Sequence, residues 1–386
     1  MKIGILTFNW AINYGAILQM YAEYRYLNKK NEVVVINYVP DYFYNMYNPK
    51  ILDKPIEIKS TLKKLLQKFL NYKQHKKFKH FISNELSLTK KAKNRKELQE
   101  IINGLDLVIV GSDQVWNYDI TKEYIRDYLL TDIKCNKISY AASLGKNHIK
   151  NELIYLFEKS LNDFDFVSLR EKASINYLKQ ICKRDDFKLC VDPVFLLNKA
   201  EWKQLAEKSN YKLPRNNFIL IYMLEYNDNL IKVARYLSKK YKIPAVSIEI
   251  PFISLRRIRK MRDIKKLHDV GPTDFLKLFL NAKYILTNSF HGTAFSLIFE
   301  KQFISFAHST VNLRMENLLN LYGLNNVQIT NTFNDDFALV EEILKKSKQT
   351  YDKQNKEIDN IVKNSKEFLN NAMNKIKTRS RDNYEK

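Results

Sequence analysis

The sequence predicts an α/β protein with two Rossmann-like domains, whose parallel sheets face a central cleft. Three observations support this class. Short apolar runs alternate with helical patterns along most of the chain, which is typical of a doubly wound parallel sheet. Polar residues directly follow several of these runs, where open α/β sheets bind ligands. The 386 residues, 45% of them hydrophobic, exceed one ordinary domain and can form two cores.

The first series of elements is expected to form a domain over residues 1–208. Continuous apolar runs, which are typical of strands buried on both faces, cover residues 3–8, 33–38, 107–110, 137–142 and 166–169. Helical patterns are expected in a basic segment after the second strand and over residues 16–27, 153–161 and 174–181. The Rossmann-like alternation ends near Asp192-Pro193.

A second series follows a polar stretch, residues 209–217, which contains Pro214 and is interpreted as a linker. The second domain is expected over residues 218–345. Its strands are predicted at residues 218–223, 245–249 and 284–286, and its helices at residues 229–240, 273–281 and 294–299. A basic loop around Arg256 separates two of these elements. Residues 346–386 are predicted to be a carboxyl-terminal helix and basic tail.

The net charge of +23 predicts attraction to anionic partners over much of the surface. Nucleic acid is not expected, because the lysines are spread along the chain and no recognised binding motif accompanies them. One helical-looking segment, residues 62–79, combines seven lysines with leucine and phenylalanine. This pattern fits peripheral contact with an anionic membrane, although an ordinary amphipathic helix with a solvated face has the same appearance.

The sequence also bears on compartment and cofactors. The amino-terminal apolar run is too short for a signal peptide and no later run approaches a membrane span, so a cytoplasmic protein is expected. Three cysteines, an odd number without metal or redox spacing, agree with a reducing compartment. No metal ligand is predicted, because no histidine or cysteine cluster has ligand spacing, and metal dependence is left open. The lack of a three-glycine fingerprint argues against a nicotinamide or flavin cofactor.

The most informative segment, Thr287-Asn288-Ser289-Phe290-His291-Gly292-Thr293, lies between an apolar strand and an apolar helix. His291 is expected in the turn between them. Gly292 would let the backbone approach a ligand closely, and the amides near Thr293 would lie at the positive end of the helix dipole. We interpret this segment as an anion site beside a titratable group. The alternative is that His291 merely caps the helix or contacts a carbonyl group.

Polar motifs also stand at other strand ends. Asn13-Tyr14-Gly15 precedes the first helix, where it either presents amides to an anion or sugar or simply caps the helix. Ser112 and Asp113 follow the strand at residues 107–110. Asp113 is the first candidate for a general base, and its alternative role is to cap the next segment.

Charged residues at further element ends suit anion binding. Arg170 follows the strand at residues 166–169, where a planar guanidinium would suit a phosphate or carboxylate. The alternative is a surface arginine paired with Glu171. Asp192 and Arg314 are additional candidates for residues that face the cleft.

Taken together, in this order and spacing, five motifs resemble the polysaccharide pyruvyl transferase family: Asn13-Tyr14-Gly15, Gly111-Ser112-Asp113, Ser168-Leu169-Arg170-Glu171, Asp192-Pro193 and Ser289-Phe290-His291-Gly292. The resemblance covers roughly residues 3–325. It implies a GT-B-like glycosyltransferase architecture. It also implies transfer of pyruvate from phosphoenolpyruvate to two hydroxyls of a sugar, which forms a cyclic ketal.

The resemblance further implies roles for individual residues. His291 would be the acid or the partner of the departing phosphate, Arg170 and Arg314 would bind the anionic donor, and Asp113 would be the base. The acceptor would be a cell-surface glycan precursor, and a lipid-linked oligosaccharide would account for contact with the anionic inner face of a membrane. The other expected substrate-binding residues are Asn13, Tyr14, Gly15, Ser112, Asp192, Ser289, Gly292 and Thr293.

Ser289 departs from the family pattern, because characterised members often carry an arginine two positions before the histidine. Either the positive charge comes from Arg170, Arg314 or the basic loop near Arg256, or the donor in this subgroup is not phosphoenolpyruvate. Two alternatives remain open. A glycosyltransferase that uses a nucleotide sugar would share the two-domain fold and an electropositive site. A catalytically inactive glycan- or membrane-binding module would keep the fold after losing that arginine.

Overall fold

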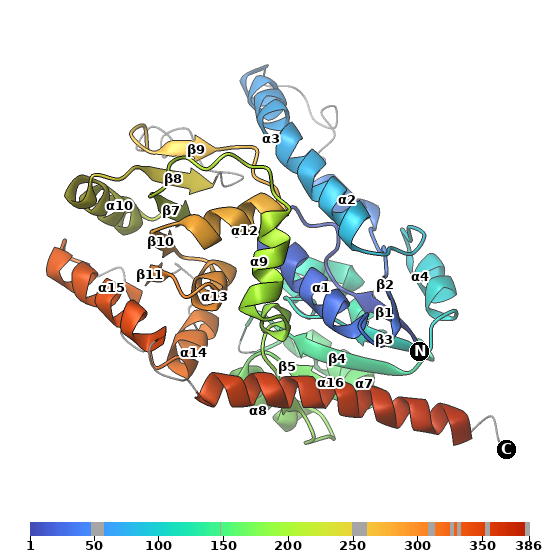
Figure 1. Cartoon of the computed structure of the whole chain (residues 1–386). Helices are drawn as coiled ribbons and strands as arrows, with labels where there is room; N and C mark the ends of the chain where they lie inside the picture. The colour runs from blue at the N-terminus through green and yellow to red at the C-terminus, as the bar shows by residue number, and fades with distance from the viewer. Residues whose placement is uncertain are drawn as a thin grey trace. The chain divides into compact units, whose positions relative to one another are not determined.

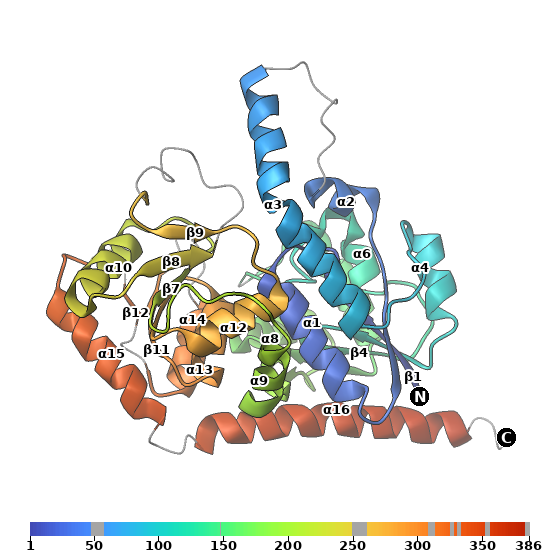
Figure 2. The same ribbon diagram turned by 45° about the horizontal axis from the view of Figure 1, so that its top comes forward.

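The computed structural model describes residues 1–47, 58–146, 148–248, 261–307, 313–324, 328–329, 333–351 and 356–382. The chain divides into two compact units. Unit 1 contains Met1–Pro55, Ile82–Leu197 and Asp359–Lys386, and unit 2 contains Ile56–Phe81 and Asn198–Ile358. Each unit is built on its own parallel six-stranded sheet (Figures 1 and 2).

The sheet of unit 1 has the strand order β2-β1-β3-β4-β5-β6. The strands are β1 (Lys2–Leu6), β2 (Glu32–Val35), β3 (Leu107–Val110), β4 (Lys137–Ala142), β5 (Phe166–Leu169) and β6 (Lys188–Leu189). The order changes direction between β1 and β3, which are paired with Leu6 opposite Val110. Open α/β sheets bind ligands at such a switch point, beyond the carboxyl ends of the strands.

Helices connect these strands because the parallel arrangement requires a crossover between neighbours. They are α1 (Tyr14–Leu27), α2 (Asp41–Tyr47), α4 (Arg95–Ile102), α5 (Tyr118–Thr121), α6 (Ile125–Tyr128), α7 (Ile154–Asn162) and α8 (Lys172–Ile181), with the 3-10 turns η1 (Lys122–Tyr124) and η2 (Asn151–Leu153). A further 3-10 turn, η3 (Pro193–Leu196), follows β6. β3 is buried at every position, which explains why its sequence is continuously apolar.

The sheet of unit 2 has the order β12-β11-β10-β7-β8-β9, and its switch point lies between β7 and β10. The strands are β7 (Ile219–Tyr222), β8 (Ala245–Ile248), β9 (Lys265–Leu267), β10 (Tyr284–Thr287), β11 (Gln302–Phe306) and β12 (Gln328–Ile329). The helices are α9 (Lys199–Glu207), α10 (Asp228–Tyr241), α12 (Pro272–Asn281), α13 (Phe290–Ile298), α14 (Leu313–Leu321) and α15 (Phe337–Tyr351).

Two helices, α3 (Ile58–Glu85) and α16 (Lys356–Asp382), belong mostly to a unit whose other residues lie in a distant part of the sequence. α3 belongs to unit 2 as far as Phe81. α16 belongs to unit 1 from Asp359 onward. There, the hydroxyl of Ser365 accepts a hydrogen bond from the backbone N–H of Val191, at 3.0 Å.

The observed boundaries differ from the expected domains at both ends of unit 2. The expected first domain ended at residue 208, but α9 belongs to unit 2 because Trp202 packs edge-on against Phe295, with ring centroids 5.0 Å apart. Residues 346–386 do not form one separate tail, since α15 packs on β11 in unit 2 and α16 returns to unit 1. None of the helices in the described ranges combines the length and apolarity needed to cross a membrane.

Candidate functional site

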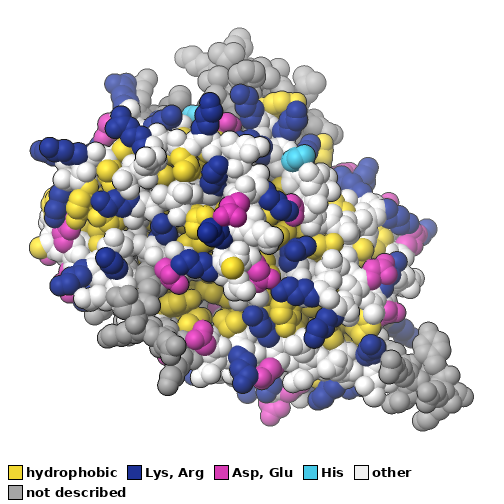
Figure 3. All heavy atoms as spheres, in the orientation of Figure 1, with side chains coloured by type: hydrophobic (Ala, Val, Ile, Leu, Met, Phe, Trp, Pro, Cys, Tyr) yellow, Lys and Arg dark blue, Asp and Glu magenta, His cyan; other side chains and the backbone are white. Residues whose placement is uncertain are grey.

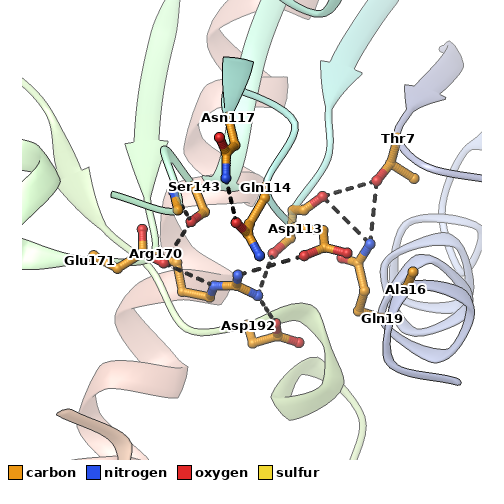
Figure 4. Close-up of polar contacts among 12 residues, drawn as sticks. Thr7, Ala16, Gln19, Asp113, Gln114, Asn117, Ser143, Arg170, Glu171 and Asp192 are labelled. Atoms are coloured by element: carbon orange, nitrogen blue, oxygen red, sulfur yellow. Dashed lines mark hydrogen bonds and ion pairs between the residues drawn. The ribbon is translucent and has the colours of Figure 1, made fainter. Parts of the chain in front are cut away.

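The carboxyl ends of β1 and β3 form a hydrogen-bonded polar edge in unit 1 (Figure 4). Thr7 follows β1, and its hydroxyl donates to the backbone carbonyl of Ser112, at 2.9 Å. Gln19 of α1 donates through Nε2 to the Thr7 hydroxyl, at 3.3 Å. All three residues are fully buried. The turn after β3 is therefore tied to the neighbouring strand at the switch point.

Arg170 brings its guanidinium from the end of β5 to this edge, where three carboxylates surround it (Figure 4). Nη1 forms an ion pair with Asp192 and lies 3.4 Å from Oγ of Ser112. Nε lies 3.4 Å from Oε1 of Glu171, and Nη2 lies 3.9 Å from Oδ1 of Asp113. Burial alone would lower the pKa of Arg170, but the attraction of Asp192, Glu171 and Asp113 raises it.

This geometry supports a positioning role for Arg170 rather than an open clamp for a substrate anion. Its side chain is only 4% exposed, so Arg170 is not a surface arginine, although it does contact Glu171. Among the three carboxylates, the side chain of Asp113 is the most accessible, at 18%, against 10% for Glu171 and 0% for Asp192. Asp113 is therefore the most solvent-accessible carboxylate of this group.

The backbone of Asp113 is held in an uncommon conformation. Its φ of 74° lies in the left-handed region, which non-glycine residues rarely adopt. Its carbonyl accepts a hydrogen bond from the N–H of Ser143, at 3.1 Å. The capping role that was an alternative for Asp113 belongs to Asn117, whose side chain accepts from the N–H of Asp119, at 3.0 Å. Backbone strain of this kind clusters at functional sites and persists where surrounding contacts enforce it.

The two carboxylates that anchor Arg170 are themselves fixed. The hydroxyl of Ser143 donates to Oε1 of Glu171, at 2.8 Å. Asp192 uses Oδ1 to accept from the N–H of Val194, at 3.1 Å, and so caps η3. With both anchors held by their own hydrogen bonds, Arg170 has little freedom to turn toward a ligand.

Glu23 of α1 is a member of this region that sequence reasoning missed. It is 0% exposed, and a Cβ atom on Gly111 would lie 2.8 Å from its Oε2. Burial raises the pKa of Glu23 well above its ordinary value, and the negative charge of Asp192 raises it further. The available signal was the one acidic residue of α1, in a helix whose other residues are mostly apolar.

The motif Asn13-Tyr14-Gly15 forms the start of α1, and its contacts stabilise that helix. Asn13 caps α1, because its Oδ1 accepts a hydrogen bond from the N–H of Ala16, at 3.2 Å. Tyr14 and Gly15 are buried in the first turn of the helix. The capping alternative therefore describes Asn13 in this structure, and its contact with a substrate stays a prediction.

In unit 2, Ser289 begins α13 by accepting a hydrogen bond from the N–H of Gly292, at 3.4 Å. His291 therefore lies in the first turn of the helix, whereas the sequence interpretation placed it in the preceding turn. Serine is a favoured N-cap residue, so α13 begins directly after Ser289, before the apolar run at residues 294–299. His291 is 9% exposed, and its ring meets that of Phe290 edge-on, with centroids 5.2 Å apart.

Gly292 and Thr293 face the protein interior. A Cβ atom on Gly292 would lie 2.1 Å from Oγ1 of Thr287, so glycine is needed here for close packing of α13 on β10. This corrects the interpretation that the glycine makes room for a ligand. Thr293 is fully buried, and its Oγ1 lies 3.2 Å from the sulfur of Met315 and 3.4 Å from the hydroxyl of Ser305.

Asn288 organises the switch point of unit 2, although its side chain was not among the expected site residues. Its Oδ1 accepts from the N–H of Leu224, at 2.7 Å, and its Nδ2 donates to the carbonyl of Glu225, at 2.9 Å. The side chain is thus the link between the end of β10 and the loop that follows β7. An asparagine at the end of an apolar strand was the signal available in the sequence.

Arg314 lies in α14, is half-buried, and precedes Met315, which contacts α13. Arg256 and its basic loop lie outside the described residues. Within the described parts of the chain, no group of three or more His, Cys, Asp or Glu side chains could hold a metal ion. The predicted residues thus fall in two groups: Asn13, Tyr14, Gly15, Ser112, Asp113, Arg170 and Asp192 in unit 1, and Ser289, His291, Gly292, Thr293 and Arg314 in unit 2.

Comparison with known proteins identifies the family. The family model described as polysaccharide pyruvyl transferase matches residues 13–310, which is most of the chain and includes both groups except Arg314. A comparison with curated protein sequences finds no match.

Solved structures show the fold. UDP-GlcNAc 2-epimerase from Neisseria meningitidis, bound to UDP-GlcNAc, superposes with a TM-score of 0.53 at 12% identity, covering 96% of this chain and 99% of that one. The UDP-N-acetylglucosamine 2-epimerase from Rickettsia bellii has a TM-score of 0.55 at 12% identity, covering 100% and 99%. A glycosyltransferase from Rickettsia africae has a TM-score of 0.50 at 11% identity, covering 95% and 98%. The expected GT-B-like α/β fold is thereby confirmed.

Proposed function

Because the chain belongs to the polysaccharide pyruvyl transferase family, we propose that it transfers pyruvate from phosphoenolpyruvate to two hydroxyls of a sugar in a cell-surface glycan precursor. Two carbon–oxygen bonds form the cyclic ketal, while the bond between the donor carbon and the phosphate oxygen breaks. The two sugar hydroxyls release two protons. One is matched by the proton that converts the donor methylene to a methyl group, and the other by the proton that the departing phosphate takes up. The reaction needs a base, an acid and a phosphate site.

The observation that carries this proposal, beyond family membership, is the accessible carboxylate of Asp113 at the switch point of unit 1. Its Oδ1 lies 3.9 Å from Nη2 of the buried Arg170. A general base must reach the hydroxyl proton and hold a productive orientation. The constrained backbone of Asp113 and the charge of Arg170 favour such an orientation. We assign Asp113 as the base and Arg170 as its positioning residue.

The switch point of unit 2 suits the anionic donor. The first-turn N–H groups of α13 lie at the positive end of the helix dipole, which favours a phosphate. His291 lies in that turn and is assigned as the acid or the partner of the departing phosphate. Ser289 supplies a helix cap where other members often have arginine, so Arg314 of α14 is assigned the missing positive charge.

Glycosyl transfer from a nucleotide sugar is the second candidate. It is favoured by one specific observation, the structural likeness to proteins of nucleotide-sugar chemistry, among them an epimerase bound to UDP-GlcNAc. Because identity is 12%, this likeness concerns the fold, and the family match favours the ketal chemistry.

Thermal unfolding with each donor class separates the two candidates. A ligand present at about one hundred times its dissociation constant stabilises the folded state by roughly 2.7 kcal/mol. We expect phosphoenolpyruvate to stabilise the parent chain but not the His291→Gln variant. The control variant His148→Gln, which changes an exposed histidine of unit 1, should still be stabilised. Pyruvyl transfer to a sugar acceptor should fail in the same variant. Stabilisation by UDP-GlcNAc alone would assign the chain to the second candidate.

A further inference from the structure

One face of the carboxyl-terminal half of α3 is docked on the protein. Phe78 and Phe81 are buried, at 0% and 4% exposure. Lys77 reaches α12, where its Nζ lies 2.7 Å from Oδ2 of Asp274. The same amine lies 4.9 Å from the centroid of the Tyr211 ring. These contacts determine which side of α3 faces inward.

The opposite face of this half of α3 is basic and exposed. Tyr72, Lys73, Lys76 and Lys79 stand at positions i, i+1, i+4 and i+7, which share one side of a helix of 3.6 residues per turn. The two buried phenylalanines, at i+6 and i+9, point to the other side. Tyr72 is 65% exposed and the three lysines are exposed as well. We call Tyr72, Lys73, Lys76 and Lys79 the lysine face.

The positive charge of the lysine face is not compensated locally. Within the described residues, no carboxylate lies within 4.0 Å of the amines of Lys73, Lys76 or Lys79, whereas Lys159 and Lys232 elsewhere on the surface pair with Asp132 and Asp335. The sequence from residue 58 to residue 84 contains no acidic residue. Figure 3 shows lysine and arginine side chains over much of the visible surface, including its upper part, where Figure 1 places α3.

We propose that the lysine face binds the surface of an anionic lipid bilayer. Lysine side chains are flexible point charges, and a cluster of them on a helix is attracted to anionic headgroups. Tyr72 adds an exposed ring with an apolar body and a polar tip, a combination that favours the headgroup level of a membrane. Nucleic acid would satisfy the charge alone, but no nucleic-acid-binding motif accompanies it. The proposal does not depend on the donor that the protein uses.

Vesicle flotation of the full chain tests this proposal. We expect the protein to float with vesicles of phosphatidylglycerol and phosphatidylcholine at moderate salt, and to stay at the bottom with pure phosphatidylcholine. The triple variant K73Q/K76Q/K79Q should bind the anionic vesicles roughly 100-fold more weakly. This follows from about 1 kcal/mol for each lysine near the surface and tenfold for each 1.4 kcal/mol.

The matched control is K239Q/K345Q/K348Q, which removes the same charge from exposed positions of α10 and α15. Its binding should change by no more than a few-fold, and both variants should keep the unfolding midpoint of the parent chain. Failure of the parent chain to float, or an equal loss in both variants, would overturn the proposal. Tighter binding to a single-stranded RNA at equal phosphate concentration would also overturn it. No donor or acceptor is present, so this result is independent of the test of pyruvyl transfer.

Discussion

Replacing Arg170 by methionine should lower the stability of unit 1, because it removes a buried positive charge. The guanidinium is 4% exposed and faces three carboxylates, one of them the fully buried Asp192. At an effective dielectric constant of about 20, one charge pair at 3.9 Å corresponds to about 4 kcal/mol before desolvation. Removing one partner of a buried ion pair costs about 3–5 kcal/mol. We expect the free energy of unfolding at pH 7 to fall by that amount.

Urea unfolding followed by circular dichroism measures this loss, and Arg235→Met is its control. Arg235 pairs with Asp263 at 2.7 Å, but these side chains are 47% and 52% exposed. An exposed pair contributes less than about 1 kcal/mol. An equal loss in the two variants would refute the reasoning from burial.

Two further predictions concern packing and protonation. Gly292→Ala should lower the free energy of unfolding by about 1–3 kcal/mol through overpacking, because its Cβ would lie 2.1 Å from Oγ1 of Thr287. The control Gly104→Ala, whose Cβ would lie 3.6 Å from its nearest neighbour, should change this free energy by less than about 0.5 kcal/mol. Equal denaturant midpoints for the two variants would contradict this prediction. Glu23→Gln should stabilise the protein increasingly as pH rises above 4.5, because the raised pKa of folded Glu23 makes its stabilising contribution disappear with rising pH. Parallel pH profiles of the unfolding midpoint would contradict the second prediction.

The fold could be predicted where each strand is buried on both faces. β3 and β10 are continuously buried, so their sequences are apolar at every position or nearly so. Four strands were not predicted. β11 was missed although four of its five residues are buried. β6, β9 and β12 are edge strands of two or three residues, and β6 and β9 contain exposed lysine. Their identity as strands depends on backbone pairing with a neighbour, such as Val246 with Lys265, which leaves no pattern in a two- or three-residue segment.

Candidate residues could be found from the ends of strands, but their contacts could not. Arg170 looked like an anion clamp because nothing in its own segment shows that Asp192 will meet its guanidinium. Gly292 looked like an opening for a ligand because the sequence does not show that Thr287 fills the space beside it. Glu23 escaped notice because the pKa of a carboxyl depends on burial and on neighbouring charges.

The alternation of apolar strands and helices, the family motifs and the excess of positive charge can be read from the sequence, because they are properties of local segments and of composition. Three features became visible only in the folded chain: Arg170 faces carboxylates, Asp113 is the most accessible of them, and the lysine face of α3 lies opposite its buried phenylalanines. The physical reason is that exposure and charge pairing arise between residues far apart in the chain, when parallel strands bring their carboxyl ends to one edge.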